Sequence, residues 1–136
     1  MSIDVTFENG KATFFSNVGW ANLLAFAEEY GWTAARTGAP EEWDAREPWP
    51  GHYDPAEGQK ITADDARRIA EALRKGLNDP DRQVAANRVA AKLSGELQSA
   101  TSSPNATIQA FRFEERALAY WHEFILNALE SGFSIG

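Results

Sequence analysis

Prolines are unevenly distributed along the chain, and their positions limit the fold more than any other feature of the sequence. Four of the six prolines lie within residues 33–60, at Pro40, Pro48, Pro50 and Pro55. Proline has no backbone N–H donor and its ring clashes with the preceding helical turn, so neither a helix nor a central strand can run through this segment. We therefore expect a long loop here, within a single domain that comprises all 136 residues.

The N-terminal residues alternate between apolar and polar side chains, as in a strand with one buried face. Ile3, Val5 and Phe7 are followed by Asn9-Gly10 and then by further β-forming residues. Asn-Gly adopts the positive φ angles of a type I′ turn, so the pattern predicts an antiparallel β-hairpin. Because two strands alone are only marginally stable, the hairpin must pack on helices or gain a third strand.

Four segments outside the loop place apolar residues at helical spacing. Signals for the ends of helices accompany them. Gly31 suits the left-handed conformation that ends many helices, and Thr62 with Asp65 can cap the helix that follows the loop. The predicted helices span residues 17–30, 62–78, 81–99 and 104–131.

The fourth of these helices is the longest and the most apolar, and we expect it to form the centre of the core. Beyond Gly132, Phe133-Ser134-Ile135 alternates in the manner of a short C-terminal strand. Residues 1–136 are thus predicted to form an α+β fold, mainly α, with about four helices, a small N-terminal antiparallel hairpin and this C-terminal strand. The side chains expected to be largely buried are Leu73, Phe111, Leu118, Trp121 and Ile125.

The chain is acidic, with 20 Asp and Glu against 13 Lys and Arg and a net charge of −7. Residues 41–57 contribute six acidic side chains and only Arg46 as a basic one, a net charge of −5. DNA and RNA backbones are bound by clusters of Lys and Arg, so nucleic acid is not an expected partner. An acidic surface suits a basic protein instead, and it also serves simply to keep a protein soluble.

Three aromatic residues are interleaved with these acidic residues, at Trp43, Trp49 and Tyr53. Aromatic side chains anchor many interfaces, but they also fasten long loops to a core, and this second role is favoured for each of the three taken singly. His52 and Asp54 are the residue types of a general base and its orienting carboxylate, although no nucleophile is evident beside them. The candidate binding residues are Trp43, Trp49, His52, Tyr53 and Asp54, and no residue is assigned a catalytic role.

The sequence carries no signature of a metal or cofactor site. There is no cysteine, which excludes disulfides and thiolate ligands. His122 has no carboxylate three or four residues away, and the acidic segment lacks the spacing of a calcium loop. No glycine-rich phosphate-binding motif is present. We therefore predict no metal and no cofactor.

The sequence also shows no targeting segment. The N-terminus has no basic region followed by an apolar run, so no secretory signal is predicted. The longest nearly apolar stretch, residues 18–27, is too short to span a bilayer. We expect a cytoplasmic protein that does not insert into a membrane.

Three parts of the chain carry a resemblance to other proteins. They are Trp20–Ala27 with Gly31-Trp32, Gly58–Ala66 running on to Leu73, and Phe124-Ile125 with Gly132–Ile135. In this order they resemble a group of small uncharacterised bacterial proteins, over most of the chain except the third helix. The resemblance implies a bacterial origin. No activity is established for that group, so it implies no function and no site residues.

These observations favour a non-enzymatic bacterial interaction protein, of the kind of an immunity protein or an antitoxin, that uses the acidic aromatic loop against a basic partner. Acidic inhibitors match basic nucleases in charge, which speeds their association. The alternative is a small enzyme or a small-molecule binder with a pocket under the 33–60 loop. A convex acidic surface would favour the first function, and a deep pocket lined by His52 the second. The oligomeric state stays open.

Overall fold

The computed structural model describes residues 2–35, 37, 38, 44, 46, 47, 53 and 59–136. These residues form four helices and four strands, and the fold is α+β and mainly α, as predicted. In chain order the elements are β1 (Ser2–Phe7), β2 (Ala12–Ser16), α1 (Asn17–Glu29), β3 (Gln59–Ile61), α2 (Ala63–Leu77), α3 (Arg82–Thr101), α4 (Glu115–Ala128) and β4 (Phe133–Ile135).

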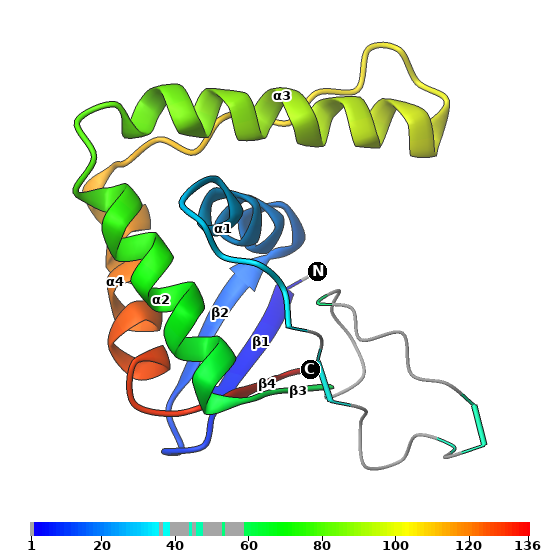
Figure 1. Ribbon diagram of the computed structural model, residues 1–136. Coiled ribbons are helices and arrows are strands. Elements are labelled where there is room, and N and C mark those ends of the chain that lie inside the picture. Colours follow the sequence, from blue (N-terminus) through cyan, green and yellow to red (C-terminus); the bar gives the residue numbers. More distant parts are fainter. Residues whose placement is uncertain (1, 36, 39–43, 45, 48–52, 54–58) are drawn as a thin grey trace.

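The strands form one antiparallel sheet in the order β2-β1-β4-β3. β4 pairs with β1, with Val5 opposite Ile135, so the predicted C-terminal strand is confirmed as the third strand of the sheet. β3 was not predicted, because three residues beside a proline-rich segment carry almost no strand pattern. Alternate residues of each strand are buried, and helices cover that face (Figure 1).

The turn of the hairpin differs from the predicted type I′ turn. The N–H of Gly10 donates to Phe7 O (2.9 Å), and the N–H of Phe7 donates to Lys11 O (2.8 Å). Gly10 has a φ of 90°, whereas Asn9 has no positive φ, so the turn has a single glycine bulge. The side chain of Asn9 explains the difference. Its Oδ1 accepts from the N–H of Lys11 (3.0 Å) and its Nδ2 donates to Oδ1 of Asn127 (3.1 Å).

Helix α1 ends as the sequence predicts. Gly31 has a φ of 100°. Its N–H donates to Glu28 O (3.2 Å), and the N–H of Trp32 donates to Ala27 O (3.1 Å). This pair of bonds is a Schellman motif, which satisfies carbonyl groups at the end of a helix. It also turns the chain so that the side chain of Trp32 returns to the core, where it is buried.

The fourth predicted helix, 104–131, is wrong in its N-terminal half. α4 begins only at Glu115, and residues 106–114 form neither helix nor strand. The ring of Phe111 stacks on that of Trp121, with 4.1 Å between centroids and 16° between planes. Ten residues of one helix would separate the two by about 15 Å, so this contact requires the chain to leave the helix and run back along it. Tertiary stacking of aromatic rings therefore overrides the local helical pattern.

The core lies between the sheet and the helices and is rich in aromatic rings. Trp20, Phe124 and Phe133 meet edge to face, with ring centroids 5.4–6.0 Å apart. Such arrangements add to the stabilisation from burial alone. Of the side chains predicted to be largely buried, Leu73, Trp121 and Ile125 are buried, whereas Phe111 and Leu118 are half-buried.

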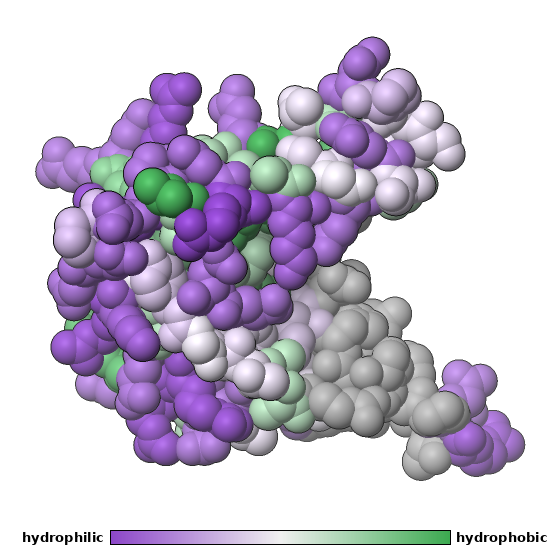
Figure 2. Space-filling view, turned by 45° about the horizontal axis from the view of Figure 1, so that its top comes forward, coloured by the Kyte–Doolittle hydropathy of each residue, from purple (hydrophilic) through white to green (hydrophobic). Residues whose placement is uncertain are grey.

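Helix α3 lies across α1 on the side away from the sheet, and its C-terminal end extends past the body of the molecule (Figure 1). Its last buried residue is Ala90, and the end beyond it packs on the chain that returns from α3. There Oγ of Ser94 accepts from the N–H of Ile108 (2.8 Å). Figure 2 shows this end as a projection of mixed, mostly hydrophilic side chains. None of the helices in the described ranges has the length and apolar character needed to cross a bilayer.

Candidate functional site

Only part of the predicted binding site can be placed. Trp43, Trp49, His52 and Asp54 lie outside the described residues, so their assignment as binding residues stays a prediction. Tyr53 is described, and it lies at the base of the 33–60 loop. The base is therefore the part of the candidate site that can be built from its contacts.

Tyr53 is held at three points, through its backbone, its ring and its hydroxyl group. Its carbonyl oxygen accepts from Nε1 of Trp20 (2.9 Å). Its ring meets that of Trp32 edge to face, with 5.2 Å between centroids and 86° between planes. Its hydroxyl donates to Oδ2 of Asp65. These contacts fasten this point of the loop to the core, in the manner that the sequence favoured for a single aromatic residue.

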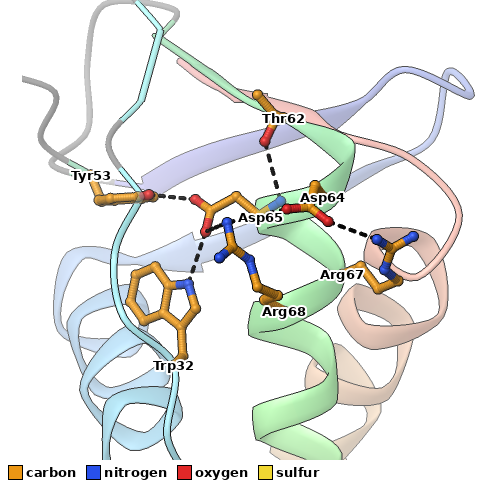
Figure 3. A network of polar contacts seen from close by, with 7 residues as sticks. All are labelled: Trp32, Tyr53, Thr62, Asp64, Asp65, Arg67 and Arg68. Atoms are coloured by element: carbon orange, nitrogen blue, oxygen red, sulfur yellow. Dashed lines mark hydrogen bonds and ion pairs between the residues drawn. The ribbon is translucent and has the colours of Figure 1, made fainter.

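Asp65 joins the loop to the ends of two helices (Figure 3). The side chain is 1% exposed, and a carboxylate so deeply buried must be hydrogen-bonded. Oδ1 accepts from Nε1 of Trp32 (3.0 Å), just past the end of α1, and Oδ2 accepts from Tyr53. Nη2 of Arg68 lies 3.9 Å from Oδ1. Asp65 also stands in the first turn of α2, where the helix dipole favours a negative charge.

The start of α2 explains how this carboxylate is positioned. Thr62 caps the helix as predicted, because its Oγ1 accepts from the N–H of Asp65 (3.2 Å). From the sequence, Asp65 was expected to take part in the cap through its side chain. Its carboxylate instead turns toward Trp32 and Tyr53 (Figure 3). The neighbouring Asp64 faces outward and pairs with Arg67 (2.7 Å).

The loop is fastened a second time, before its acidic part begins. The N–H of Gly38 donates to Lys60 O (2.7 Å), and the N–H of Lys60 donates to Gly38 O (3.0 Å). Thr37, beside this bridge, is buried. The bridge places Gly38 beside β3 at the edge of the sheet. The loop is thus attached to the sheet at Gly38 and to the core at Tyr53.

Two of the described charged residues between these ties, Asp44 and Arg46, form an ion pair. Nε and Nη2 of Arg46 donate to Oδ1 and Oδ2 of Asp44, each at 3.1 Å. The side chain and the backbone N–H of Arg46 together hold the pKa of the Asp44 carboxyl below its ordinary value. Arg46 is the only basic residue in 41–57, so the one cation of this segment is bound to an acidic residue of the same segment.

A groove of about 370 Å³ lies beside the base of the loop. Trp32 and Ala72 line it, together with the charged side chains of Arg68, Glu71 and Lys75. Among the described features, this groove best matches the pocket that the alternative function requires. Within the described ranges, no three His, Asp or Glu side chains gather as metal ligands.

Sequence reasoning missed the connection of Trp32 and Asp65 to the loop. In the sequence, Trp32 simply follows the glycine that ends a helix, and Asp65 is part of a helix cap. Nothing in their spacing indicates that they meet, because they are 33 positions apart. His122, by contrast, is exposed on α4.

Comparison with known proteins adds no relative. The chain matches no family model, and no curated protein or solved structure is significantly similar to it. The resemblance of its three segments to a group of small bacterial proteins therefore stays a prediction.

Proposed function

We propose that this protein is a non-enzymatic bacterial interaction protein, which binds a basic protein in the cytoplasm through its acidic 33–60 loop, as an immunity protein or an antitoxin does. The observation that carries the proposal is the double fastening of the loop, at the Gly38–Lys60 bridge and at Tyr53. The acidic segment, with its net charge of −5, includes Tyr53 and follows the bridge directly. A recognition segment held at fixed points loses less conformational entropy on binding than a free tail.

Charge and aromatic residues would have separate tasks in such a complex. Excess negative charge attracts a basic partner over distances of about 10 Å at moderate salt, which raises the association rate. Aromatic side chains act after contact, by burying apolar area and slowing dissociation. Trp43 and Trp49 are the aromatic residues of the acidic segment that are available for this second task by sequence.

The test begins with capture of the partner on the immobilised protein from a bacterial lysate and its identification by mass spectrometry. Association and dissociation rates of the purified pair are then measured at two salt concentrations. The loop variant combines Glu41→Gln, Glu42→Gln, Asp44→Asn and Glu47→Gln. We expect its association to slow by roughly tenfold and to depend less on salt.

A matched variant controls for total charge. It combines Asp4→Asn, Asp81→Asn, Glu96→Gln and Glu114→Gln, four exposed acidic residues outside the loop. This variant should associate nearly as fast as the wild-type protein. Trp49→Ala should shorten the lifetime of the complex and leave the association rate almost unchanged. Rates that are unaltered in the loop variant would show that the acidic loop is not the recognition surface.

The groove beside Trp32 favours a second candidate function, the binding of a small molecule at the base of the loop. Its charged lining consists of Arg68, Lys75 and Glu71, and this excess of positive charge beside Trp32 suits a small anion with an apolar part. A ligand at a hundredfold excess over its Kd would stabilise the fold by about 2.7 kcal/mol, which a thermal shift detects. If no protein is captured and a small anionic molecule raises the Tm, this second function replaces the first.

A further inference from the structure

An apolar groove lies between the C-terminal part of α2 and helix α4. It has a volume of about 540 Å³. Leu126 stands at its edge with 67% of the side chain exposed, the highest value among the large apolar residues described. The apolar part of the lining consists of Leu77, Ile125, Leu126 and Leu129, and the polar part of Arg74, Asn78 and His122.

The helical positions on α4 show how charges flank this groove. Successive residues of a helix turn by about 100°, so Ile125 and Leu129 lie on one side of Leu126 and Glu123 and Glu130 on the other. Ile125 and Leu129 line the groove, which places them on the side of α2. Glu123 and Glu130 are both exposed.

The face therefore has a fixed order from one edge to the other. First come the acidic residues Glu123 and Glu130, then the ridge of Leu126, then the apolar groove, and last Arg74 on α2. A two-fold axis that runs along α4 reverses this order in a second copy. Leu126 of each copy then meets the groove of the other, and each acidic edge meets Arg74 of the other. A surface with this property is self-complementary, as a symmetric dimer interface must be.

We propose that the α2–α4 face is a homodimer interface, in which Leu126 of each protomer inserts into the groove between Leu77 and Leu129 of the other. Insertion would cover the exposed apolar side chain. Pairing of the acidic edge with Arg74 fixes the register and the parallel direction of the two α4 helices. The proposed contact is made by residues of α2 and α4, and the proposed recognition of a basic partner by residues of the loop, so different variants test the two proposals.

The first experiment measures the mass of the protein in solution by sedimentation equilibrium, from low micromolar to millimolar concentration. We expect a mass that approaches twice the 15.0 kDa of one chain. Leu126→Asp should return it to 15.0 kDa, because a charge would enter the apolar groove. Val84→Asp is the control, since Val84 is 52% exposed on α3, and this variant should still dimerise. A mass of one chain at every concentration, or a dimer unaffected by Leu126→Asp, would overturn the proposal.

A charge reversal tests the symmetry and keeps the result separate from misfolding. Arg74→Glu alone should raise the dissociation constant of the dimer roughly tenfold or more, because like charges then meet across the interface. Adding Glu123→Lys and Glu130→Lys to the same chain should restore dimerisation. Circular dichroism monitors the fold of each variant. Failure of the restored chain to dimerise while it remains folded would rule out this interface, and binding of a helical peptide to a strictly monomeric chain would assign the groove to a different partner.

Discussion

At the scale of single residues, Asp65 has the widest structural consequence. Its carboxylate accepts hydrogen bonds from a tryptophan that precedes the loop and from a tyrosine within it. A side chain that is nearly inaccessible and charged cannot find replacement partners in water if one of these donors is removed. A change that disrupts the base of the loop should therefore also destabilise the start of α2, and the reverse should hold as well.

Replacement of Asp65 should accordingly cost much more than replacement of its neighbour. Asp65→Ala leaves Nε1 of Trp32 without its acceptor, and we expect the free energy of unfolding to fall by about 3 kcal/mol. Asp64→Ala removes exposed ion pairs with Arg67 and Arg68 and one of the two carboxylates in the first turn of α2, and it should change this free energy by only about 1 kcal/mol or less. Urea denaturation of both variants measures the difference. Equal costs would mean that the carboxylate of Asp65 does not hold the loop.

Tyr30 is a second residue whose environment has a measurable consequence. Its hydroxyl donates to Oδ2 of Asp79 (2.7 Å), which links the end of α1 to the turn after α2. Burial of the phenol, then this hydrogen bond and the negative charge of Asp79, raise the pKa of Tyr30 to about 12. The same contact, after the backbone N–H of Asp81, lowers the pKa of Asp79.

The raised pKa of Tyr30 predicts a loss of stability at alkaline pH. An unfolded tyrosine loses its proton near pH 10, about two units before the folded residue does. The contribution is therefore complete below about pH 10 and is lost as the pH rises toward 12, because the folded state then binds more protons than the unfolded state. Urea midpoints measured between pH 9 and about 12 should decline in the wild-type protein and less in Tyr30→Phe. Tyr120→Phe, a change at an exposed residue, should decline as the wild-type protein does.

At the scale of elements, contact between helices decides which glycine positions can change. A Cβ atom on Gly76 of α2 would lie 2.4 Å from Cε2 of Phe26 and 2.7 Å from Cδ2 of Tyr30, both on or next to α1. A Cβ atom on Gly95 of α3 would meet nothing within 4 Å. Both glycines lie inside a helix, where glycine has the same low helix propensity, and only their surroundings differ.

The same substitution should thus have opposite effects at these two positions. Gly76→Ala should lower the free energy of unfolding by about 2 kcal/mol, because Phe26 is buried among other rings and cannot move aside. Gly95→Ala should raise it by about 0.5–1 kcal/mol through the better helix propensity of alanine. Thermal and urea unfolding of the two variants measure whether the free energy of unfolding falls or rises. Stabilisation by both changes would mean that α1 and α2 do not approach each other as closely as described.

At the scale of the whole molecule, stability is distributed unevenly along α3. Its N-terminal half packs on α1 through Ala85, Ala86, Val89 and Ala90, and none of its described residues beyond Ala90 is buried. Segments with few buried contacts open more readily than the core. We expect backbone amides of residues 91–101 to exchange hydrogen faster than those of 82–90. Equal protection along the helix would show that its projecting end is covered in solution.

Much of this fold can be predicted from local patterns in the sequence. The ends of α1 and α2 follow from Gly31 and Thr62, because a left-handed residue and a cap act within a few positions along the chain. The hairpin and the C-terminal strand follow from alternation, although the turn type does not, since Asn9 bonds to Asn127 far along the chain. The candidate site is predictable only as a segment, and the binding roles of Trp43, Trp49, His52 and Asp54 stay predictions.

The sequence by itself determined the class of fold, the positions of most helices and the acidic character of the loop, since these depend on neighbouring residues and on charge. Tertiary structure alone decided where α4 begins, because the stack of Phe111 on Trp121 outweighs a helical pattern of spacing. It also decided the fourth strand, whose three residues acquire order only by pairing with β4. Finally, it brought Trp32, Tyr53 and Asp65 together, because a buried carboxylate takes its donors from whichever segments the core places beside it.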